Sequence, residues 1–331
     1  MARQRKILRA AVLTARRTER ISIATPNDFT LAADQPLEPG EAASLGLLPY
    51  CLDILRRRSV YVGGADMREA QGAPFYYLYL RRNARFVVTI PWEAGALARN
   101  NSRAPVLLFS PGRCGSTLLS RILFEAGIAN VSEPDFYTQA TSQWAASAFN
   151  PLRPVMRRAV LAMGGDLCQV LSQSGPTVAK LRAESCRAPA LVADPRERRV
   201  LFMTRNFADW ARSTERIFRN APAKMIGKYF AALSCYDFLR RNGDCRLIRY
   251  EDLTADPYSV CRGLAAFLGR EISAMAIDAA MKKDSQEGTP LAQGRRDETS
   301  DSERRLAQTL ALWNSDKVKR MRGRLDAASE I

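Results

Sequence analysis

The chain has 331 residues, with 50 Lys and Arg against 34 Asp and Glu, so its formal net charge is +16. Apolar residues make up 47% and charged residues 25%, which is ordinary for a globular protein that needs no disulfides at this length. The sequence contains no histidine, which excludes Ser-His-Asp and Cys-His catalytic sites, His-ligated zinc or haem, and an imidazole general base. Any proton transfer must therefore fall to a carboxylate, Lys, Tyr or Cys.

Cysteine usage and hydropathy indicate the compartment. The seven cysteines are scattered and never spaced as C-x-x-C, which indicates a reduced compartment without a disulfide framework or a structural zinc. No apolar run approaches the roughly 18 residues of a membrane-spanning helix. Arginines interrupt the short apolar stretch near the N-terminus, which makes it a poor secretory signal. We therefore expect a cytoplasmic protein, and the net charge predicts anionic partners.

The composition of the N-terminal part predicts a small β-rich extension that covers residues 1–104. Residues 1–25 form a basic, helix-permissive segment, and residues 26–45 have the composition of a linker. The stretches SVYVGG, FYYLYLRR and RFVVTIPW between residues 59 and 92 are rich in Val, Tyr and Phe. They predict a β-meander or hairpin.

From Pro105 onward, apolar strand-like runs alternate with helical patterns. This alternation predicts a P-loop-type α/β domain over residues 105–331, with a mostly parallel sheet flanked by helices. The expected strands are PVLLFS (105–110), TVAKL (177–181), RRVLFMTR (198–205) and CRLIRYEDL (245–253). The expected helices cover residues 117–127, 151–174, 206–218 and 256–269, with a last helix ending in the basic run 316–324.

The most informative stretch is VLLFSPGRCGSTLL, in which a buried strand runs through a glycine-bearing loop directly into a helix. Backbone N–H groups and the helix N-terminus then converge on one point, which suits an anion. Gly112 and Gly115 let the backbone approach closely, and Arg113 supplies a positive charge. Ser116 and Thr117 supply hydroxyls. A Walker A loop would have Lys after Gly115, so an ATPase or an ordinary kinase is not expected. The alternative is a plain glycine turn with Arg113 in solvent.

The segment PGRCGSTLL resembles the 5′-phosphosulfate loop of the sulfotransferase superfamily, whose usual form is P-[RK]-S-G-[ST]-[ST]. Members of that superfamily use 3′-phosphoadenosine 5′-phosphosulfate (PAPS) as sulfuryl donor, so the resemblance implies PAPS as co-substrate. This loop departs from the pattern in two ways. Gly112 is an extra residue between Pro111 and Arg113, and Cys114 stands where Ser is common.

A second segment, FMTRNFADWARS, resembles the site where the superfamily holds the cofactor's 3′-phosphate. There an Arg at a strand end is followed eight residues later by a Ser, and Arg205 and Ser213 have this spacing. Arg suits a phosphate because its donors are forked and always charged. The alternative pairs Arg205 with Asp209 on the helix surface. The segment LIRYEDLTADP also resembles the family's R-Y-E-D-L segment, so the resemblance covers about residues 105–325.

The resemblance also implies residues for the chemistry. Many family members use His as base, but a branch resembling the tyrosylprotein sulfotransferases uses a Glu shortly after the loop helix. Glu133, 20 residues after Arg113, is the expected general base, with Asp135 as its nearest rival. Lys180 resembles the lysine near the transferring group and is expected to stabilise charge on the bridging oxygen, while Arg113 holds the phosphosulfate. The alternatives are a loop carboxylate that neutralises arginines and an ordinary strand-end lysine.

Other residues are assigned more loosely. A late polar loop is expected to close over the nucleotide with Ser285, Arg295 and Arg296. Four aromatic residues either line an acceptor pocket, stack on adenine or belong to the core: Phe136, Tyr137, Trp144 and Trp210. The basic segments 3–20 and 317–324 either attract an anionic membrane surface or polyanion, or form solvated helix faces.

The sequence thus predicts a PAPS-dependent sulfotransferase that moves the sulfuryl group to a hydroxyl or amine acceptor. Arg and Lys supply the cationic stabilisation, so we expect no metal, and no specific nucleic-acid partner is expected. Two other functions stay open. One is a non-catalytic, sulfotransferase-like binding protein for an anionic ligand, and the other is a nucleotide kinase with a degenerate loop.

Overall fold

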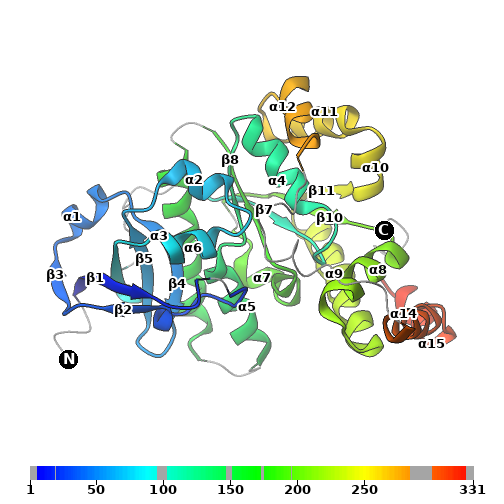
Figure 1. The fold of residues 1–331 in the computed structure, drawn as a ribbon, viewed down its shortest axis with the longest axis horizontal. Coiled ribbons are helices and arrows are strands. Elements are labelled where there is room, and N and C mark those ends of the chain that lie inside the picture. The colour runs from blue at the N-terminus through cyan, green and yellow to red at the C-terminus, as the bar shows by residue number, and fades with distance from the viewer. Residues whose placement is uncertain are drawn as a thin grey trace. The chain divides into compact units, whose positions relative to one another are not determined.

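The computed structural model describes residues 6–18, 20–94, 103–146, 151–172, 175–194, 196–283 and 300–325 (Figure 1). The chain divides into two compact units that interleave along the sequence. The first unit comprises Met1–Leu107, Gly127–Leu181 and Ala190–Glu197, and the second comprises Leu108–Ala126, Arg182–Pro189 and Arg198–Ile331. The domain boundary expected between residues 104 and 105 stays a prediction.

An antiparallel sheet lies in the first unit, with the strand order β2-β1-β6-β5-β4 and with β3 also paired to β1. Its strands are β1 (Ile7–Ala15), β2 (Phe29–Leu31), β3 (Gln35–Leu37), β4 (Leu48–Asp53), β5 (Arg58–Gly63) and β6 (Phe86–Pro91). They are the blue to cyan arrows of Figure 1. The expected β-rich character of the N-terminal part is confirmed.

Three local expectations in this part are wrong. The basic segment predicted to be helix-permissive contains strand β1, and the segment predicted as a linker contains β2, β3 and a short helix. The run FYYLYLRR, predicted as a strand, forms helix α3 (Tyr76–Asn83). Most of α3 is buried, so its sequence carries no apolar stripe by which a helix could be told from a strand. Strand β1 pairs with three partners, and such pairing overrides the helix propensity of its Ala, Leu and Arg residues.

A five-stranded sheet has the order β11-β10-β7-β9-β8, in which β8 and β9 are parallel and β10 and β11 are parallel. Its strands are β7 (Val106–Phe109), β8 (Ala129–Ser132), β9 (Thr177–Lys180), β10 (Arg199–Thr204) and β11 (Asp244–Arg249). All residues of β7, β8 and β9 are buried, as is typical of parallel strands covered on both faces. The predicted α/β class with a parallel sheet is confirmed. The last expected strand is shorter than predicted, because Tyr250 already begins a helix.

Helices and 3₁₀ turns connect these strands. The helices are α1 (Pro39–Ser44), α2 (Met67–Gly72), α3, α4 (Ser116–Glu125), α5 (Asp135–Ala146), α6 (Arg153–Leu171), α7 (Pro189–Val192), α8 (Phe207–Phe218), α9 (Pro222–Asn242), α10 (Tyr250–Ala255), α11 (Pro257–Leu268), α12 (Ala274–Met281), α14 (Ser300–Trp313) and α15 (Asp316–Arg322). The 3₁₀ turns are η2 (Pro26–Asp28), η3 (Trp92–Ala94) and η4 (Ala183–Arg187). None of the helices in the described part of the chain combines the length and apolar composition that a bilayer crossing requires.

Helix α8 shows how the sequence positions a candidate functional residue. The Asn206 side chain accepts a hydrogen bond from the Ala208 N–H and so caps the helix at its predicted start. The buried positions of the helix follow a helical period and include Phe207, Trp210 and Thr214. Ser213 lies on the same helix and is only partly buried.

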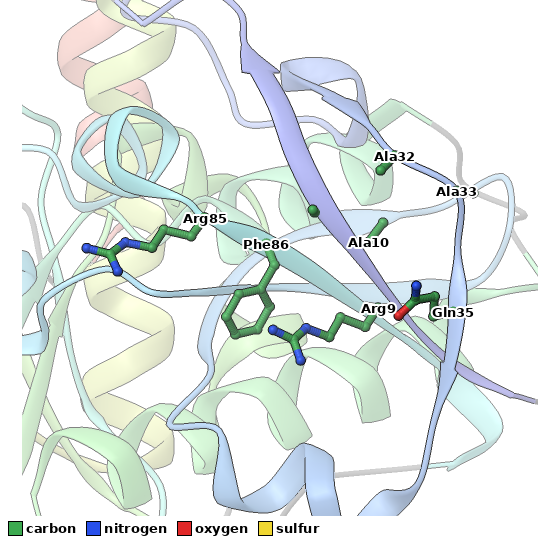
Figure 2. Close-up of a pocket in the computed structure, with 8 residues that line it drawn as sticks. Arg9, Ala10, Ala32, Ala33, Gln35, Arg85 and Phe86 are labelled. Carbon is green, nitrogen blue, oxygen red and sulfur yellow. The ribbon is translucent and has the colours of Figure 1, made fainter.

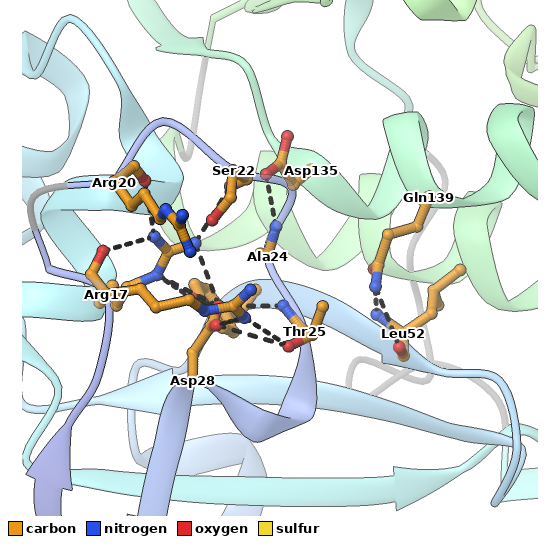
Figure 3. A network of polar contacts seen from close by, with 11 residues as sticks. Arg17, Arg20, Ser22, Ala24, Thr25, Asp28, Leu52, Asp135 and Gln139 are labelled. Atoms are coloured by element: carbon orange, nitrogen blue, oxygen red, sulfur yellow. Dashed lines mark hydrogen bonds and ion pairs between the residues drawn. The ribbon is translucent and has the colours of Figure 1, made fainter. Parts of the chain in front are cut away.

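A polar network in the first unit surrounds Asp28, with Arg17 and Thr25 beside it (Figure 3). Asp28 and Arg81 are fully buried, and the Arg81 Nε donates to Oδ2 of Asp28 at 3.1 Å. Arg81 also donates to the backbone carbonyls of Arg17 at 2.9 Å, Arg20 at 3.0 Å and Ser22 at 3.1 Å. Arg17 forms a second ion pair with Asp28. The chain between β1 and η2 is thus tied to α3 by one guanidinium group.

The Asp28→Asn variant is expected to lose about 3–5 kcal/mol of unfolding free energy, because it leaves two arginines facing a neutral amide in a buried place. The matched control is Asp34→Asn, which removes an exposed carboxylate nearby and is expected to cost at most about 0.5 kcal/mol. Urea denaturation measures both values. Equal losses in the two variants would contradict the role of Asp28.

Candidate anion-binding site

The loop between β7 and α4 adopts an unusual backbone. Gly112 and Gly115 have φ angles of +76° and +80°, and Arg113 itself has φ of +57°. The left-handed region is open to glycine but costs energy at a residue with a side chain such as Arg113. Gly115 is the N-cap of α4, so the loop delivers its backbone N–H groups to the N-terminus of a ten-residue helix. Such an arrangement is typical of phosphate and sulfate sites.

The Gly112 carbonyl accepts a hydrogen bond that connects the loop to α8 in the same unit. The indole Nε1–H of Trp210 donates to it at 2.9 Å, and the Cys114 thiol donates to it at 3.1 Å. The Gly112 N–H in turn donates to Oγ of Ser110 at 3.2 Å. Gly112 is the residue that the usual family pattern lacks. The inserted residue therefore has its own hydrogen-bond partners.

Burial governs the chemistry of Cys114. Its side chain is fully buried, and this desolvation raises the pKa of the thiol well above its usual range, although Arg205 acts in the opposite direction. The thiol is therefore neutral at physiological pH, because a raised pKa favours the protonated form. Cys114 acts as a hydrogen-bond donor within the loop and not as a nucleophile.

The second expected phosphate-binding segment lies in the same unit as the loop. Arg113 Nε lies 3.3 Å from Oγ of Ser213, so the two segments meet through these side chains. The guanidinium of Arg205 lies over the ring of Tyr250, with Cζ 4.4 Å from the ring centroid. Asp209, the alternative partner of Arg205, pairs with Arg212 at 3.2 Å instead.

Tyr250 connects Arg205 to the loop. A Cβ placed on Gly115 would lie 2.4 Å from Cδ2 of Tyr250, so the ring packs directly against the bare backbone of this glycine. The Tyr229 hydroxyl donates to the Arg205 carbonyl at 2.7 Å and fixes the backbone there. The Nε of Arg205 is buried, and within the described residues it has no hydrogen-bond partner. An arginine held in this way can still bind an anion.

A second cluster lies in the first unit, at the carboxyl ends of β8 and β9. Lys180 Nζ lies 3.0 Å from Oγ of Ser132 and 3.3 Å from Oε1 of Glu133. The side chains of Lys180 and Glu133 are 5% and 16% exposed, so the ion pair is largely buried. The Glu133 N–H donates to the Lys180 carbonyl at 2.7 Å, and Glu133 adopts a φ of +64°. Ligands of open α/β sheets bind at this edge of the strands.

Asp135, the expected rival of Glu133 as base, has a structural role. It is fully buried, and its Oδ2 accepts a hydrogen bond from the Ala24 N–H at 2.7 Å (Figure 3). Gln139, one turn further along α5, exchanges two hydrogen bonds with the backbone of Leu52 in β4. The first turns of α5 therefore dock this helix onto the N-terminal segment and the antiparallel sheet.

The aromatic residues named from the sequence belong to the core wherever their side chains are described. Phe136, Tyr137 and Trp210 are buried, so they follow the core alternative. Trp210 packs against Phe207 and Tyr229, with centroid distances of 5.7 and 4.9 Å. The Trp144 side chain lies outside the described residues. The same holds for the residues expected to close over the nucleotide: Ser285, Arg295 and Arg296.

Two contributors to the site were not assigned from the sequence. Trp210 was considered only for its ring, whereas its N–H holds the loop. Tyr250 belongs to the R-Y-E-D segment, which was the available signal, but its contact with Gly115 depends on packing that no spacing reveals. Within the described ranges there is no group of three or more Cys, Asp or Glu residues able to hold a metal ion.

The Trp210→Phe variant is expected to loosen the loop, because it removes the N–H that binds the Gly112 carbonyl. A lost hydrogen bond of this kind is worth about 1 kcal/mol, so Cys114 should react about fivefold faster with iodoacetamide. Peptide mass spectrometry measures this rate. The matched control is Trp313→Phe, which shrinks a ring stacked on Phe207 in the same aromatic cluster. Equal Cys114 rates in the two variants would contradict the fastening role of Trp210.

Comparison with known proteins finds similarity to solved structures. No protein-family model matches the chain, and no curated protein matches it. The mouse sulfotransferase SULT7A1 complexed with PAP is 12% identical over 85% of this chain and 92% of its own, with a TM-score of 0.37.

Two further similar structures are sulfotransferase domains. The sulfotransferase domain of the curacin biosynthetic pathway is 14% identical over 63% of this chain and 97% of its own, with a TM-score of 0.33. The sulfotransferase domain of the Synechococcus PCC 7002 olefin synthase is 17% identical over 62% of this chain and 94% of its own, with a TM-score of 0.33. These three structures are a sulfotransferase and two sulfotransferase domains, at a level of likeness that assigns neither a substrate nor a reaction to this chain.

Proposed function

We propose that this chain is a sulfotransferase that moves the sulfuryl group of PAPS to a hydroxyl or amine acceptor. The observation that carries the proposal is the contact between Arg113 and Ser213, which belong to two segments 100 residues apart. One segment has the form of a 5′-phosphosulfate loop and the other has the spacing of a 3′-phosphate site. A cofactor with anionic groups at both its 3′ and 5′ positions requires such segments to lie together.

The residues present suit PAPS. The buried Nε of Arg205, unpartnered among the described residues, is a donor of the kind that the 3′-phosphate would engage, with Ser213 as the second donor. The glycine loop, Arg113 and the first residues of α4, Ser116 and Thr117, would hold the 5′-phosphosulfate. PAPS supplies the sulfuryl group and leaves as adenosine 3′,5′-bisphosphate.

The pair of Glu133 and Lys180 would carry out the proton transfer and charge stabilisation. The acceptor oxygen or nitrogen forms a bond to sulfur while the bond from sulfur to the 5′-phosphate oxygen breaks. The acceptor's proton passes to the Glu133 carboxylate, and the ammonium of Lys180 stabilises the negative charge that develops on the leaving oxygen. The salt bridge at 3.3 Å supports these roles, since it compensates both charges in a largely buried place and holds both side chains in position.

Calorimetric titration with adenosine 3′,5′-bisphosphate tests the cofactor. We expect binding that ATP does not reproduce, and a loss of about 10- to 100-fold in affinity for Arg205→Ala, because a charge-assisted hydrogen bond is worth about 1.5–3 kcal/mol. The matched control is Arg212→Ala, an exposed arginine of α8 that pairs with Asp209. A preference for ATP would favour the kinase, and no binding of either nucleotide would favour a non-catalytic binder of another anion.

The release of sulfate from PAPS, with water as acceptor, tests the base. In Glu133→Gln we expect the rate to fall by about 100- to 10,000-fold, the usual contribution of a general base, while the affinity for adenosine 3′,5′-bisphosphate stays within about twofold. An unchanged rate in this variant would remove Glu133 from the mechanism. A parallel loss of affinity would instead indicate a folding defect at the end of β8.

A further inference from the structure

The cations of the first unit lie in contrasting surroundings. Arg9 is exposed beside β1, where its guanidinium stacks on the ring of Phe86 (Figure 2). Arg85 lies against Gly64 and extends away from Arg9, so these two cations do not converge. The side chain of Lys180 is instead only 5% exposed, with oxygen atoms of two neighbouring side chains around its ammonium. A buried charge depends on such partners, so the groups around Lys180 bear directly on its chemistry.

The register of the parallel sheet places Ser132 beside Lys180. The two residues are paired at the last position of β8 and β9. Paired residues on neighbouring strands point to the same side of a sheet. Ser132 is 2% exposed, and its Oγ accepts a hydrogen bond from Nζ of Lys180 at 3.0 Å. The sheet itself therefore supplies a fixed acceptor for this ammonium.

Glu133 reaches the same ammonium through a break in the strand. Successive residues of an extended strand point to opposite faces, so an extended Glu133 would point away from Lys180. Glu133 has instead a φ of +64°, and its N–H donates to the Lys180 carbonyl at 2.7 Å. Its Oε1 lies 3.3 Å from Nζ of Lys180. The ammonium thus has two anchors of different kinds, a neutral hydroxyl on β8 and the carboxylate of the residue that follows.

The two anchors would behave differently during the proposed sulfuryl transfer. When the Glu133 carboxylate takes the acceptor's proton, it loses its negative charge, and its attraction for the ammonium weakens. The Ser132 hydroxyl is neutral throughout, so its hydrogen bond to Lys180 persists. Negative charge develops on the leaving oxygen at the same stage, and a donor held in place beforehand stabilises that charge best. The ammonium therefore needs an anchor that proton transfer does not alter.

We propose that Ser132 is a positioning residue that holds the Lys180 ammonium in place while Glu133 becomes protonated. This role rests on the proposed sulfuryl transfer. Ser132 acts through Lys180 and forms no bond with the reacting atoms. A hydrogen bond from a charged donor is stronger than one between neutral groups, which suits the hydroxyl to this role.

Sulfate release from PAPS, measured at saturating PAPS, tests the role in turnover. In Ser132→Ala we expect the rate to fall about tenfold, the contribution of one hydrogen bond to a charged group, while the affinity for adenosine 3′,5′-bisphosphate stays within about twofold. Ser132→Thr keeps the hydroxyl and should restore the rate. A hydroxyl with a merely structural role would not produce a loss confined to the rate that threonine reverses.

The matched control is Thr177→Val, which removes a buried hydroxyl at the opposite end of β9 and keeps the size of the side chain. We expect this variant to turn over PAPS at the wild-type rate. A wild-type rate in Ser132→Ala, or equal losses in Ser132→Ala and Thr177→Val, would overturn the proposal.

Acylation of Lys180 by acetic anhydride, followed by peptide mass spectrometry, tests the contact without PAPS. Only the neutral amine reacts, and loss of the Ser132 hydroxyl destabilises the ammonium relative to the amine. Lys180 should therefore react about tenfold faster in Ser132→Ala than in the wild type, Ser132→Thr or Thr177→Val. An unchanged rate in Ser132→Ala would refute the anchoring role. A wild-type chain that releases no sulfate from PAPS would refute the proposed function, and the acylation rates would still decide whether Ser132 anchors Lys180.

Discussion

The hydrogen bond from the Trp210 indole to the Gly112 carbonyl is the interaction on which the conformation of the glycine loop between β7 and α4 depends. The loop contains left-handed residues at 112, 113 and 115, and Arg113 pays a conformational cost for its φ of +57°. Such a backbone persists only where surrounding contacts hold it. Trp210 supplies one of these contacts from a fully buried position on α8, the helix that also carries Ser213. The shape of the loop and the position of Ser213 are therefore set by one helix.

The arginines of this basic chain differ in whether their N–H donors already have hydrogen-bond partners within the protein. Arg81 donates to a carboxylate and to three backbone carbonyls, so it stabilises the first unit and has little capacity left for a ligand. Arg205 and Arg9 are instead oriented by aromatic rings, which hold the face of the guanidinium and leave its edge available. A net charge of +16 alone could not distinguish these classes. The distinction depends on the partners of each side chain.

Sequence patterns predicted those elements of the α/β part that carried a clear local signal, such as the all-apolar run of β7 and the helix that begins at Asn206. Strand β8 and helices α5 and α9 were not predicted. The N-terminal part was predicted less well. Strand β1 has helix-forming residues but pairs with three strands, and most of α3 is buried, so its sequence carries no clear apolar stripe. In both segments tertiary contacts outweigh local preference.

The sequence by itself determined that no histidine takes part in any chemistry, that a glycine-bearing loop joins a buried strand to a helix, and that Arg205 and Ser213 follow it at a definite spacing. These are statements about residue type and order, which need no coordinates. Only the tertiary structure shows how the surroundings of Glu133 and Asp135 differ, although they are two residues apart. The Asp135 carboxylate accepts a hydrogen bond from the Ala24 N–H inside the core, whereas Glu133 lies at a strand end beside the Lys180 ammonium. The roles of Trp210 and Tyr250 were likewise decided by packing, because hydrogen bonds and close contacts between distant segments leave no trace in local spacing.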